Sequence, residues 1–271
     1  MSEVRAGHLI AWVALGALFA ILLVHMRMAE ANLGHASLLS GYLLYALLVA
    51  LACFNVRKRL AMVPLGRASI WTAAHVFGGM FGIALYWLHT RSLWPSGLYE
   101  QGLAAIVYVV TATGVLGYVI QRVVPRRLTQ TGVEVIYERI PDEIARLREE
   151  AERVVVECTR ELQSDTLARY YFETFAWYFE RPRFVASHLF GSQHGLHWVR
   201  QQRLTVSRYL EPRELEYLDA LTELGYTKTR VDVHYSLQSA MKKWLLLHVP
   251  LSAALLGMAT WHLLLVHVYA L

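Results

Sequence analysis

The hydrophobic pattern of the chain is dominated by long runs of apolar residues separated by polar segments. Five such runs cover approximately residues 8–25, 38–54, 68–89, 103–120 and 244–270. Each approaches or exceeds the roughly 17–25 residues with which a helix crosses the hydrocarbon core of a bilayer. The pattern predicts five transmembrane helices and leaves a more polar segment, residues 122–243, between the fourth and the fifth. The first run has the basic start of a signal peptide, but we interpret it as a retained helix.

The composition agrees with a membrane protein. Apolar residues make up 56% of the chain and charged residues 17%, which is too hydrophobic for an ordinary soluble domain. The net charge of +5 comes from cations beside the apolar runs, so contact with anionic lipid explains it and no nucleic acid is expected as a partner. The two cysteines, Cys53 and Cys158, cannot form a disulfide framework or a metal site by themselves.

The distribution of cations predicts the orientation of the helices. Two loops are rich in them and hold Arg57, Lys58, Arg59 and Arg67, and Arg122, Arg126 and Arg127. The other two loops hold only Arg27 and Arg91. Because cation-rich loops remain in the cytoplasm, the amino terminus is expected inside, and the third and fifth helices are expected to run in parallel from inside to outside.

Two apolar runs carry histidines at the same spacing. His75 and His89 lie fourteen residues apart in the third run, and His248 and His262 lie fourteen apart in the fifth. Fourteen residues of helix return to within about 40° of the starting direction and rise about 21 Å. In parallel helices, His75 should therefore face His248 on the inner side, and His89 should face His262 on the outer side.

Paired imidazoles at two depths are the arrangement needed to hold two haems. Neutral imidazole is a suitable iron ligand, and two of them close both axial positions of a haem iron. Electrons could then cross the bilayer in steps. The alternative is that these histidines are buried, hydrogen-bonded structural residues, although ionisable groups inside membranes are costly and usually functional.

The third run also contains a cluster of glycines, Gly78, Gly79 and Gly82. Each glycine lowers helix propensity by about 1 kcal/mol in water, so the cluster needs a packing reason. One reason is close approach of another helix. The other is a flat macrocycle lying against the backbone between the two histidines, which makes these glycines candidate cofactor-binding residues.

The spacing of His75/His89 and His248/His262, with the glycines between the first pair, resembles the di-haem membrane b-type cytochromes. Cytochrome b of quinol-oxidising complexes has fourteen-residue pairs on two parallel helices, and the transmembrane domain of ferric reductases and NADPH oxidases has its pairs on spans three and five. The resemblance implies two haem b groups with bis-histidine iron. The chain departs from these families because no sixth run follows and no GxGxxG dinucleotide signature occurs. Electrons are therefore expected to come from another protein.

The polar segment is predicted to be mostly helical. Val133, Val135 and Tyr137 alternate like a short strand, and apolar residues at spacings of three and four predict an amphipathic helix over 144–162. A second helix is expected over 167–179, where crowded aromatic residues indicate either a quinone or cofactor surface or an aromatic core. A third should run from Pro212 to Gly225, and residues 232–243 should lead as a helix into the last span.

Several other residues have weaker claims to a function. His188, His194 and His197 match no established metal-ligand pattern, and we interpret them as structural or surface residues. His267 points away from the ligand face of its helix. The cations beside the inner boundary, which include Lys242 and Lys243, either neutralise haem propionates or only determine topology.

The sequence thus predicts an all-α integral membrane protein, a five-helix bundle with a small cytoplasmic domain between spans four and five. The expected parts are residues 1–121, 122–243 and 244–271. The expected function is that of a di-haem b-type cytochrome subunit in an oxidoreductase complex of the bacterial cytoplasmic (inner) membrane. Its expected partners are membrane lipid, a periplasmic cytochrome c or a cytoplasmic iron–sulfur protein or flavoprotein, with quinone as a further candidate. The alternatives are a stand-alone ferric-reductase-like terminal reductase and a non-redox scaffold.

Overall fold

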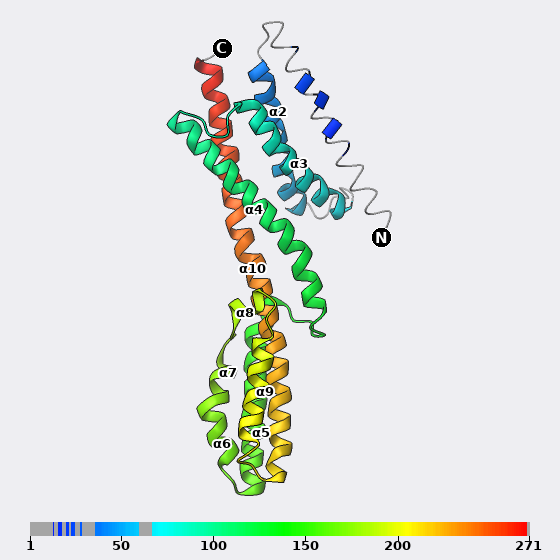
Figure 1. The fold of residues 1–271 in the computed structure, drawn as a ribbon, viewed down its shortest axis with the longest axis vertical. Coiled ribbons are helices and arrows are strands. Elements are labelled where there is room, and N and C mark those ends of the chain that lie inside the picture. The colour runs from blue at the N-terminus through cyan, green and yellow to red at the C-terminus, as the bar shows by residue number, and fades with distance from the viewer. Residues whose placement is uncertain are drawn as a thin grey trace. The chain divides into compact units, whose positions relative to one another are not determined.

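The computed structural model describes residues 36–59 and 67–269, together with isolated positions between residues 13 and 28. Within these residues all regular elements are helices and there is no strand (Figure 1). The chain divides into two compact units. The first comprises Met1–Tyr118 and Trp244–Leu271, and the second comprises Val119–Lys243.

Among the described residues, four helices are long and apolar enough to cross a membrane. They are α2 (Ala36–Arg59), α3 (Ala68–Thr90), α4 (Leu98–Thr129) and α10 (Pro212–Tyr269). These helices contain the second to fifth predicted runs. Only a small share of each apolar stretch is buried inside the protein, as expected where lipid covers the outer faces. The first predicted run, 8–25, lies outside the continuously described residues, so five spans and the cytoplasmic side of the second unit stay predictions.

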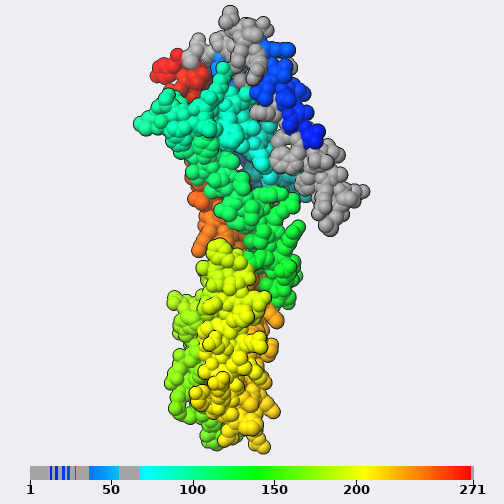
Figure 2. Space-filling model, in the orientation of Figure 1, coloured from blue at the N-terminus to red at the C-terminus, as the bar shows by residue number. Residues whose placement is uncertain are grey.

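The second unit is a bundle of helices around an aromatic core. Its helices are α5 (Ile140–Leu162), α6 (Thr166–Tyr170), α7 (Ala176–Glu180), α8 (Val185–Leu189), α9 (His194–Val206) and the first part of α10. One π-helical turn, Tyr171–Phe175, joins α6 to α7. The surface of α9, drawn in yellow, forms part of the face seen in Figure 2.

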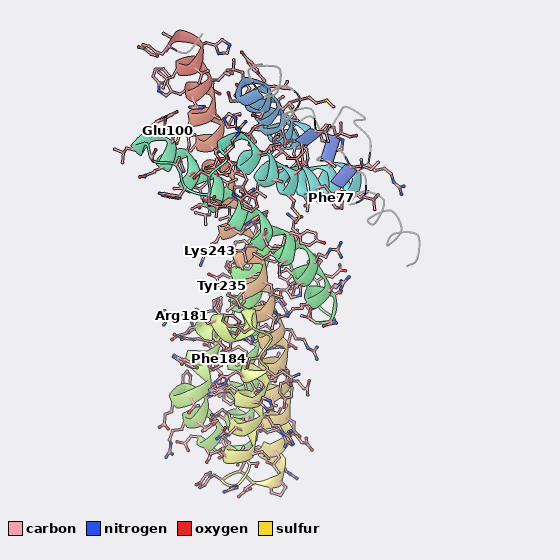
Figure 3. The ribbon with its side chains drawn as sticks, turned by 45° about the horizontal axis from the view of Figure 1, so that its top comes forward. Phe77, Glu100, Arg181, Phe184, Tyr235 and Lys243 are labelled. Atoms are coloured by element: carbon pink, nitrogen blue, oxygen red, sulfur yellow. The ribbon has the colours of Figure 1, made fainter. Side chains whose placement is uncertain are left out.

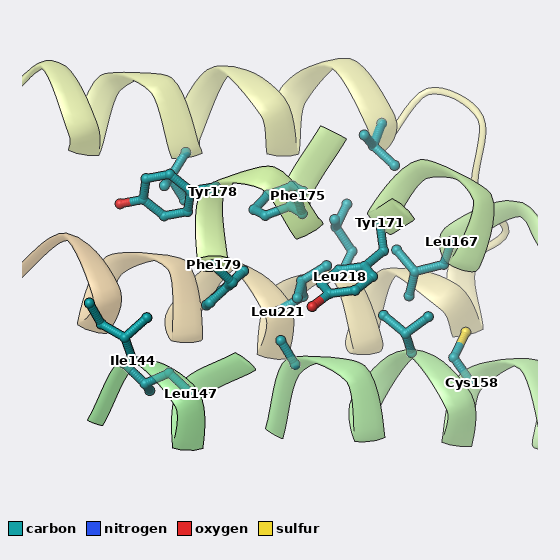
Figure 4. Close-up of a cluster of buried hydrophobic side chains, with 14 of the residues drawn as sticks. Ile144, Leu147, Cys158, Leu167, Tyr171, Phe175, Tyr178, Phe179, Leu218 and Leu221 are labelled. Atoms are coloured by element: carbon teal, nitrogen blue, oxygen red, sulfur yellow. The ribbon is translucent and has the colours of Figure 1, made fainter. Parts of the chain in front are cut away.

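The core of this unit follows from the predicted periodicity. The amphipathic helix is confirmed as α5, whose buried residues recur at spacings of three and four: Ile140, Ile144, Leu147, Ala151, Val155 and Cys158. The aromatic cluster packs against this stripe as a core, with Tyr171, Phe175, Tyr178 and Phe179 fully buried (Figure 4). The interpretation of these rings as a core is therefore favoured over that of a cofactor surface.

The predicted strand near residue 133 is wrong. Residues 133–136 have no regular structure, and Tyr137–Arg139 is a turn of 3-10 helix. This segment pairs with a helix instead of another strand, because Val135 O accepts a hydrogen bond from Gln238 Nε2 at 2.8 Å and the Tyr137 ring stacks on Tyr235 at 5.8 Å. A short alternation of apolar residues fits such packing as well as it fits a strand.

The predicted helix end at Gly225 is also wrong, because α10 continues without interruption from Pro212 to Tyr269. Gly225 serves close packing instead. A Cβ at this position would lie 3.0 Å from Val199 Cγ1 on α9, so glycine allows α9 to approach the backbone of α10.

A buried ion pair crosses the core of the second unit. Lys228 and Asp232, one turn apart on α10, are both fully buried, and Lys228 Nζ lies 2.6 Å from Asp232 Oδ2. The ammonium also donates to Arg181 O at 2.9 Å and lies 4.1 Å from the centroid of the Tyr178 ring. Removing one partner of such a pair leaves a buried charge and typically costs about 3–5 kcal/mol.

Two buried imidazoles are expected to make the second unit sensitive to acid. His188 and His234 are almost completely buried, and burial lowers the pKa of both. An imidazole in the unfolded chain titrates near about 6.5. Below that pH the unfolded state takes up protons that the folded state does not, so this contribution to stability is present above about pH 6.5 and is lost as the pH falls.

We predict that His188→Leu reduces the loss of stability between pH 7 and pH 5. Burial raises the pKa of Asp232 to about 6, so protonation of this carboxyl increases the stability of the folded state as the pH falls. The variant retains Asp232, and this opposite contribution is therefore the same in both proteins. The measurement is thiol labelling of the buried Cys158 during denaturant titration of the full-length protein at both pH values, with the exposed Cys53 as an internal reference. An equal pH response in the variant and the unaltered protein would contradict the prediction.

Candidate functional site

The four predicted histidines lie in two pairs within the first unit. The rings of His75 on α3 and His248 on α10 have centroids 6.5 Å apart and planes at 83°. The rings of His89 on α3 and His262 on α10 also have centroids 6.5 Å apart, with planes at 81°. All four side chains are half-buried. Each pair therefore joins α3 to α10, and the second pair lies fourteen residues further along both helices than the first.

The separation within each pair suits a shared metal ion. A metal–imidazole bond is about 2 Å long and the ring centroid lies about 1 Å further, so two imidazoles on one iron have centroids roughly 6 Å apart. The observed 6.5 Å is close to this separation, although it is also within the range of roughly 4.5–7 Å over which two rings make an ordinary edge-to-face contact.

Hydrogen bonds at the inner pair fix the proton on His248. Its Nδ1 lies 2.9 Å from Thr113 Oγ1 on α4. The Thr113 hydroxyl donates its own hydrogen to the carbonyls of Val109 and Val110 at 2.9 and 3.0 Å. With its hydrogen on these carbonyls, the hydroxyl oxygen can accept from His248 Nδ1–H, and this tautomer has the lone pair of the ring on Nε2.

The outer pair shows the same arrangement at His89. Its Nδ1 lies 3.2 Å from the carbonyl oxygen of Ser37, which can only accept. It also lies 3.1 Å from Ser40 Oγ, whose hydrogen is donated to Ser37 O at 2.9 Å. His89 therefore carries its proton on Nδ1 and its lone pair on Nε2, and ligating histidines usually donate their second N–H to such a partner.

Aromatic rings flank both pairs. Trp244 stacks on His248 with centroids 5.5 Å apart, and its Nε1 donates to Thr113 O at 2.7 Å. Tyr99 stacks on His262 at 6.1 Å, and its hydroxyl donates to Met258 O at 2.9 Å. These rings hold the imidazoles in orientation and cover one face of each.

Three glycines provide space beside the histidines. A Cβ at Gly41 would lie 3.0 Å from His89 Cε1, and one at Gly114 would lie 3.6 Å from His248 Cε1. At Gly117 a Cβ would overlap the Trp244 ring. These positions on α2 and α4 allow the histidines and the tryptophan to lie against the backbone of a neighbouring helix.

The glycines selected from the sequence divide between two roles. A Cβ at Gly78 would lie 2.9 Å from Leu51 Cδ2, and one at Gly82 would lie 3.6 Å from Leu47 Cδ2. Gly78 therefore serves the close approach of α2 to α3, which was the first of the two predicted reasons, whereas a Cβ at Gly82 would make an ordinary contact. A Cβ at Gly79 would meet no heavy atom of the described residues within 4 Å, so this position alone leaves open space beside the helix between the histidines.

Sequence reasoning missed the partners of the histidines. Ser40 and Thr113 are buried polar residues within apolar helices, and such residues in a predicted span are a usable signal because each needs a hydrogen-bond partner. Two of the four histidines set aside from the sequence have other contacts. His267 accepts a hydrogen bond from Tyr42 OH at 2.7 Å, and His194 packs on the Phe184 ring at 4.7 Å.

The donor set fits axial ligation and not a compact metal site. Among the described residues no group of three or more His, Cys, Asp or Glu side chains could hold a metal ion, so each pair offers two ligands only. Comparison with known protein families, curated proteins and solved structures finds no match. The geometry of the paired histidines therefore carries the functional argument.

We predict that Thr113→Val weakens the inner site alone. The variant keeps the shape of the side chain but leaves His248 Nδ1–H without its acceptor, and loss of such a partner typically costs about 10–100-fold in metal affinity. The measurement is the loss of haem from the purified protein when it is challenged with apomyoglobin.

Thr111→Val is the matched control, because Thr111 Oγ1 donates to Val107 O on its own helix, at 2.8 Å. It should retain haem as the unaltered protein does. Equal loss from both variants would show that the threonine acts on the helix and not on His248.

Proposed function

We propose that the protein is a membrane di-haem b-type cytochrome subunit that carries electrons across the bilayer between redox partners of an oxidoreductase complex. The observation that supports this most is the repetition of one geometry, two imidazole pairs with centroids 6.5 Å apart on the same two helices. His75 and His248 would hold one haem iron, and His89 and His262 would hold the second. Bound haem iron would supply one-electron redox chemistry at each level.

The ligand set favours electron transfer over substrate chemistry at the metal. Two imidazoles from each pair would hold one haem iron, and an iron held in this way would supply electron transfer and would not bind oxygen or another small ligand. The acceptors at Thr113 and Ser37 hold the Nδ1 protons, fix the ring orientations and raise the basicity of the ligating nitrogens. The stacked rings of Trp244 and Tyr99 exclude water from one face of their histidines.

The proposal includes redox partners outside this chain. The sequence contains no dinucleotide-binding signature, so electrons would pass between the histidine-held sites and a periplasmic cytochrome c, a cytoplasmic iron–sulfur protein or flavoprotein, or quinone. The proposed location is the bacterial cytoplasmic membrane, and the cation distribution favours an amino terminus on its inner side. Reduction of an external acceptor by the isolated, prereduced protein would instead favour a terminal reductase.

We predict that the purified protein contains about two haems per chain and that single variants remove them one level at a time. His248→Ala should remove the inner haem, and His262→Ala should remove the outer, because each iron loses an axial ligand. The measurement is the haem-to-protein ratio from pyridine haemochrome spectra, with reduced b-type bands in the optical spectrum.

His267→Ala is the control, since this histidine lies on the same helix but bonds to Tyr42, and it should retain both haems. A preparation without haem, or loss of both haems from His267→Ala as readily as from His262→Ala, would exclude the proposed ligand set.

We further predict strongly anisotropic low-spin ferric signals in the electron paramagnetic resonance spectrum of both haems. The ring planes lie at 83° in the inner pair and 81° in the outer pair, and nearly perpendicular axial imidazoles give this type of spectrum, whereas parallel rings give a well-resolved rhombic one. A rhombic spectrum from either site would show that its rings do not keep the arrangement described.

A further inference from the structure

A short apolar turn on the second unit is exposed and held in a fixed position. It follows α8 and consists of Leu189, Phe190 and Gly191. Leu189 is 37% exposed and Phe190 is 91% exposed, although both are large hydrophobic side chains. One exposed hydrophobic residue is ordinary on a protein surface. This turn differs because an arginine of α4 holds it in place near the end of an apolar helix.

Arg127 of α4 fixes the turn. Its guanidinium donates to Leu189 O at 2.7 Å and to His188 O at 2.6 Å, and charge-assisted bonds of this kind are about twice as strong as neutral ones. Gly191 has a φ of +80°, and a Cβ there would lie 3.3 Å from Arg127 Nη2. Glycine at this position thus allows both the backbone conformation and the close contact with the arginine.

The position of Arg127 on α4 relates the turn to the end of an apolar helix. The apolar run of α4 stops before Arg122, and Arg127 is five residues further, about 7.5 Å along a helix. The headgroup layer extends roughly 5–8 Å beyond the hydrocarbon on each side of a bilayer. On a membrane-spanning α4, Arg127 and the turn that it holds therefore lie at the level of the headgroups.

Exposed cations lie on the two segments that meet at the turn. Arg126, next to Arg127 on α4, and Arg181, eight residues before Leu189, are exposed, and Arg181 O accepts a hydrogen bond from Lys228, which fixes the backbone at the start of this segment. Arg181 and Phe184 lie toward the Tyr235 end of the second unit (Figure 3), the end at which α10 continues into its apolar stretch. Basic residues beside an exposed aromatic ring are typical of segments that bind membrane interfaces.

We propose that the Leu189–Phe190 turn is a membrane-interface anchor, with the Phe190 ring among the lipid headgroups and neighbouring arginines at the phosphates of anionic phospholipids. This role is independent of haem and adds a second attachment of the second unit to the bilayer besides the helices that enter it. The sequence does not predict this anchor, because two apolar residues are too few to form a long apolar run.

The test is photo-crosslinking of the full-length protein in lipid nanodiscs. Phe190 is replaced by p-benzoylphenylalanine, and adducts are identified by mass spectrometry in nanodiscs of phosphatidylcholine alone and of phosphatidylcholine mixed with phosphatidylglycerol. We expect phospholipid adducts at position 190, several-fold more abundant when phosphatidylglycerol is present. Labelling resistance of the buried Cys158 shows that the variant is folded.

The matched control is p-benzoylphenylalanine at Tyr209, which is 76% exposed and lies just before Pro212 at the start of α10. About 30 residues of helix, roughly 45 Å, separate that end of the unit from Lys243. Position 209 should give no lipid adduct. Equal yields at 190 and 209, adducts to protein only, or a yield at 190 that does not respond to phosphatidylglycerol would overturn the proposal of an anionic-lipid anchor.

Discussion

An imidazole that is buried among apolar helices needs a hydrogen-bond acceptor for its N–H, and in the first unit neighbouring helices provide hydrogen-bond partners for His89 and His248. Nδ1 of His89 is hydrogen-bonded to Ser37 and Ser40 of α2, and Nδ1 of His248 is hydrogen-bonded to Thr113 of α4. Buried polar groups without partners are costly, so α2 and α4 are required beside the two helices that carry the pairs. The helices that contribute no proposed ligand thus hold the Nδ1 side of His89 and of His248, two of the four paired histidines.

The same requirement explains the small residues around the pairs. A ring that reaches a hydroxyl or carbonyl on the next helix must lie close to that helix, and Gly41 and Gly117 provide the space for His89 and Trp244. In membranes, small residues at helix contacts usually allow backbones to approach each other. Here Gly41 and Gly117 allow a ring to approach a backbone. One of these rings is the proposed ligand His89, and the other is Trp244, which stacks on the proposed ligand His248.

The helices of the first unit and the facing of the histidines could be predicted because both follow from periodicity, which a sequence displays directly. The partners of the histidines could not, because one serine or threonine within an apolar run has no period. The strand near Val135 and the break at Gly225 were wrong for a related reason. Alternation and glycine each have several structural causes, and contacts with Gln238 and Val199 decide among them. Those contacts join residues that are distant in the sequence.

The uninterrupted course of α10 has a consequence for how the protein is made. Each pair joins α3, near the beginning of the described chain, to α10, at its end, so more than half of the sequence separates the two members. While α3 is synthesised and inserted, His75 and His89 have no partner to share an ion with. Both pairs become complete together, when the single helix that carries His248 and His262 enters the bilayer. Loading of the proposed haems would therefore wait for the synthesis of α10 and would not accompany the insertion of the earlier helices.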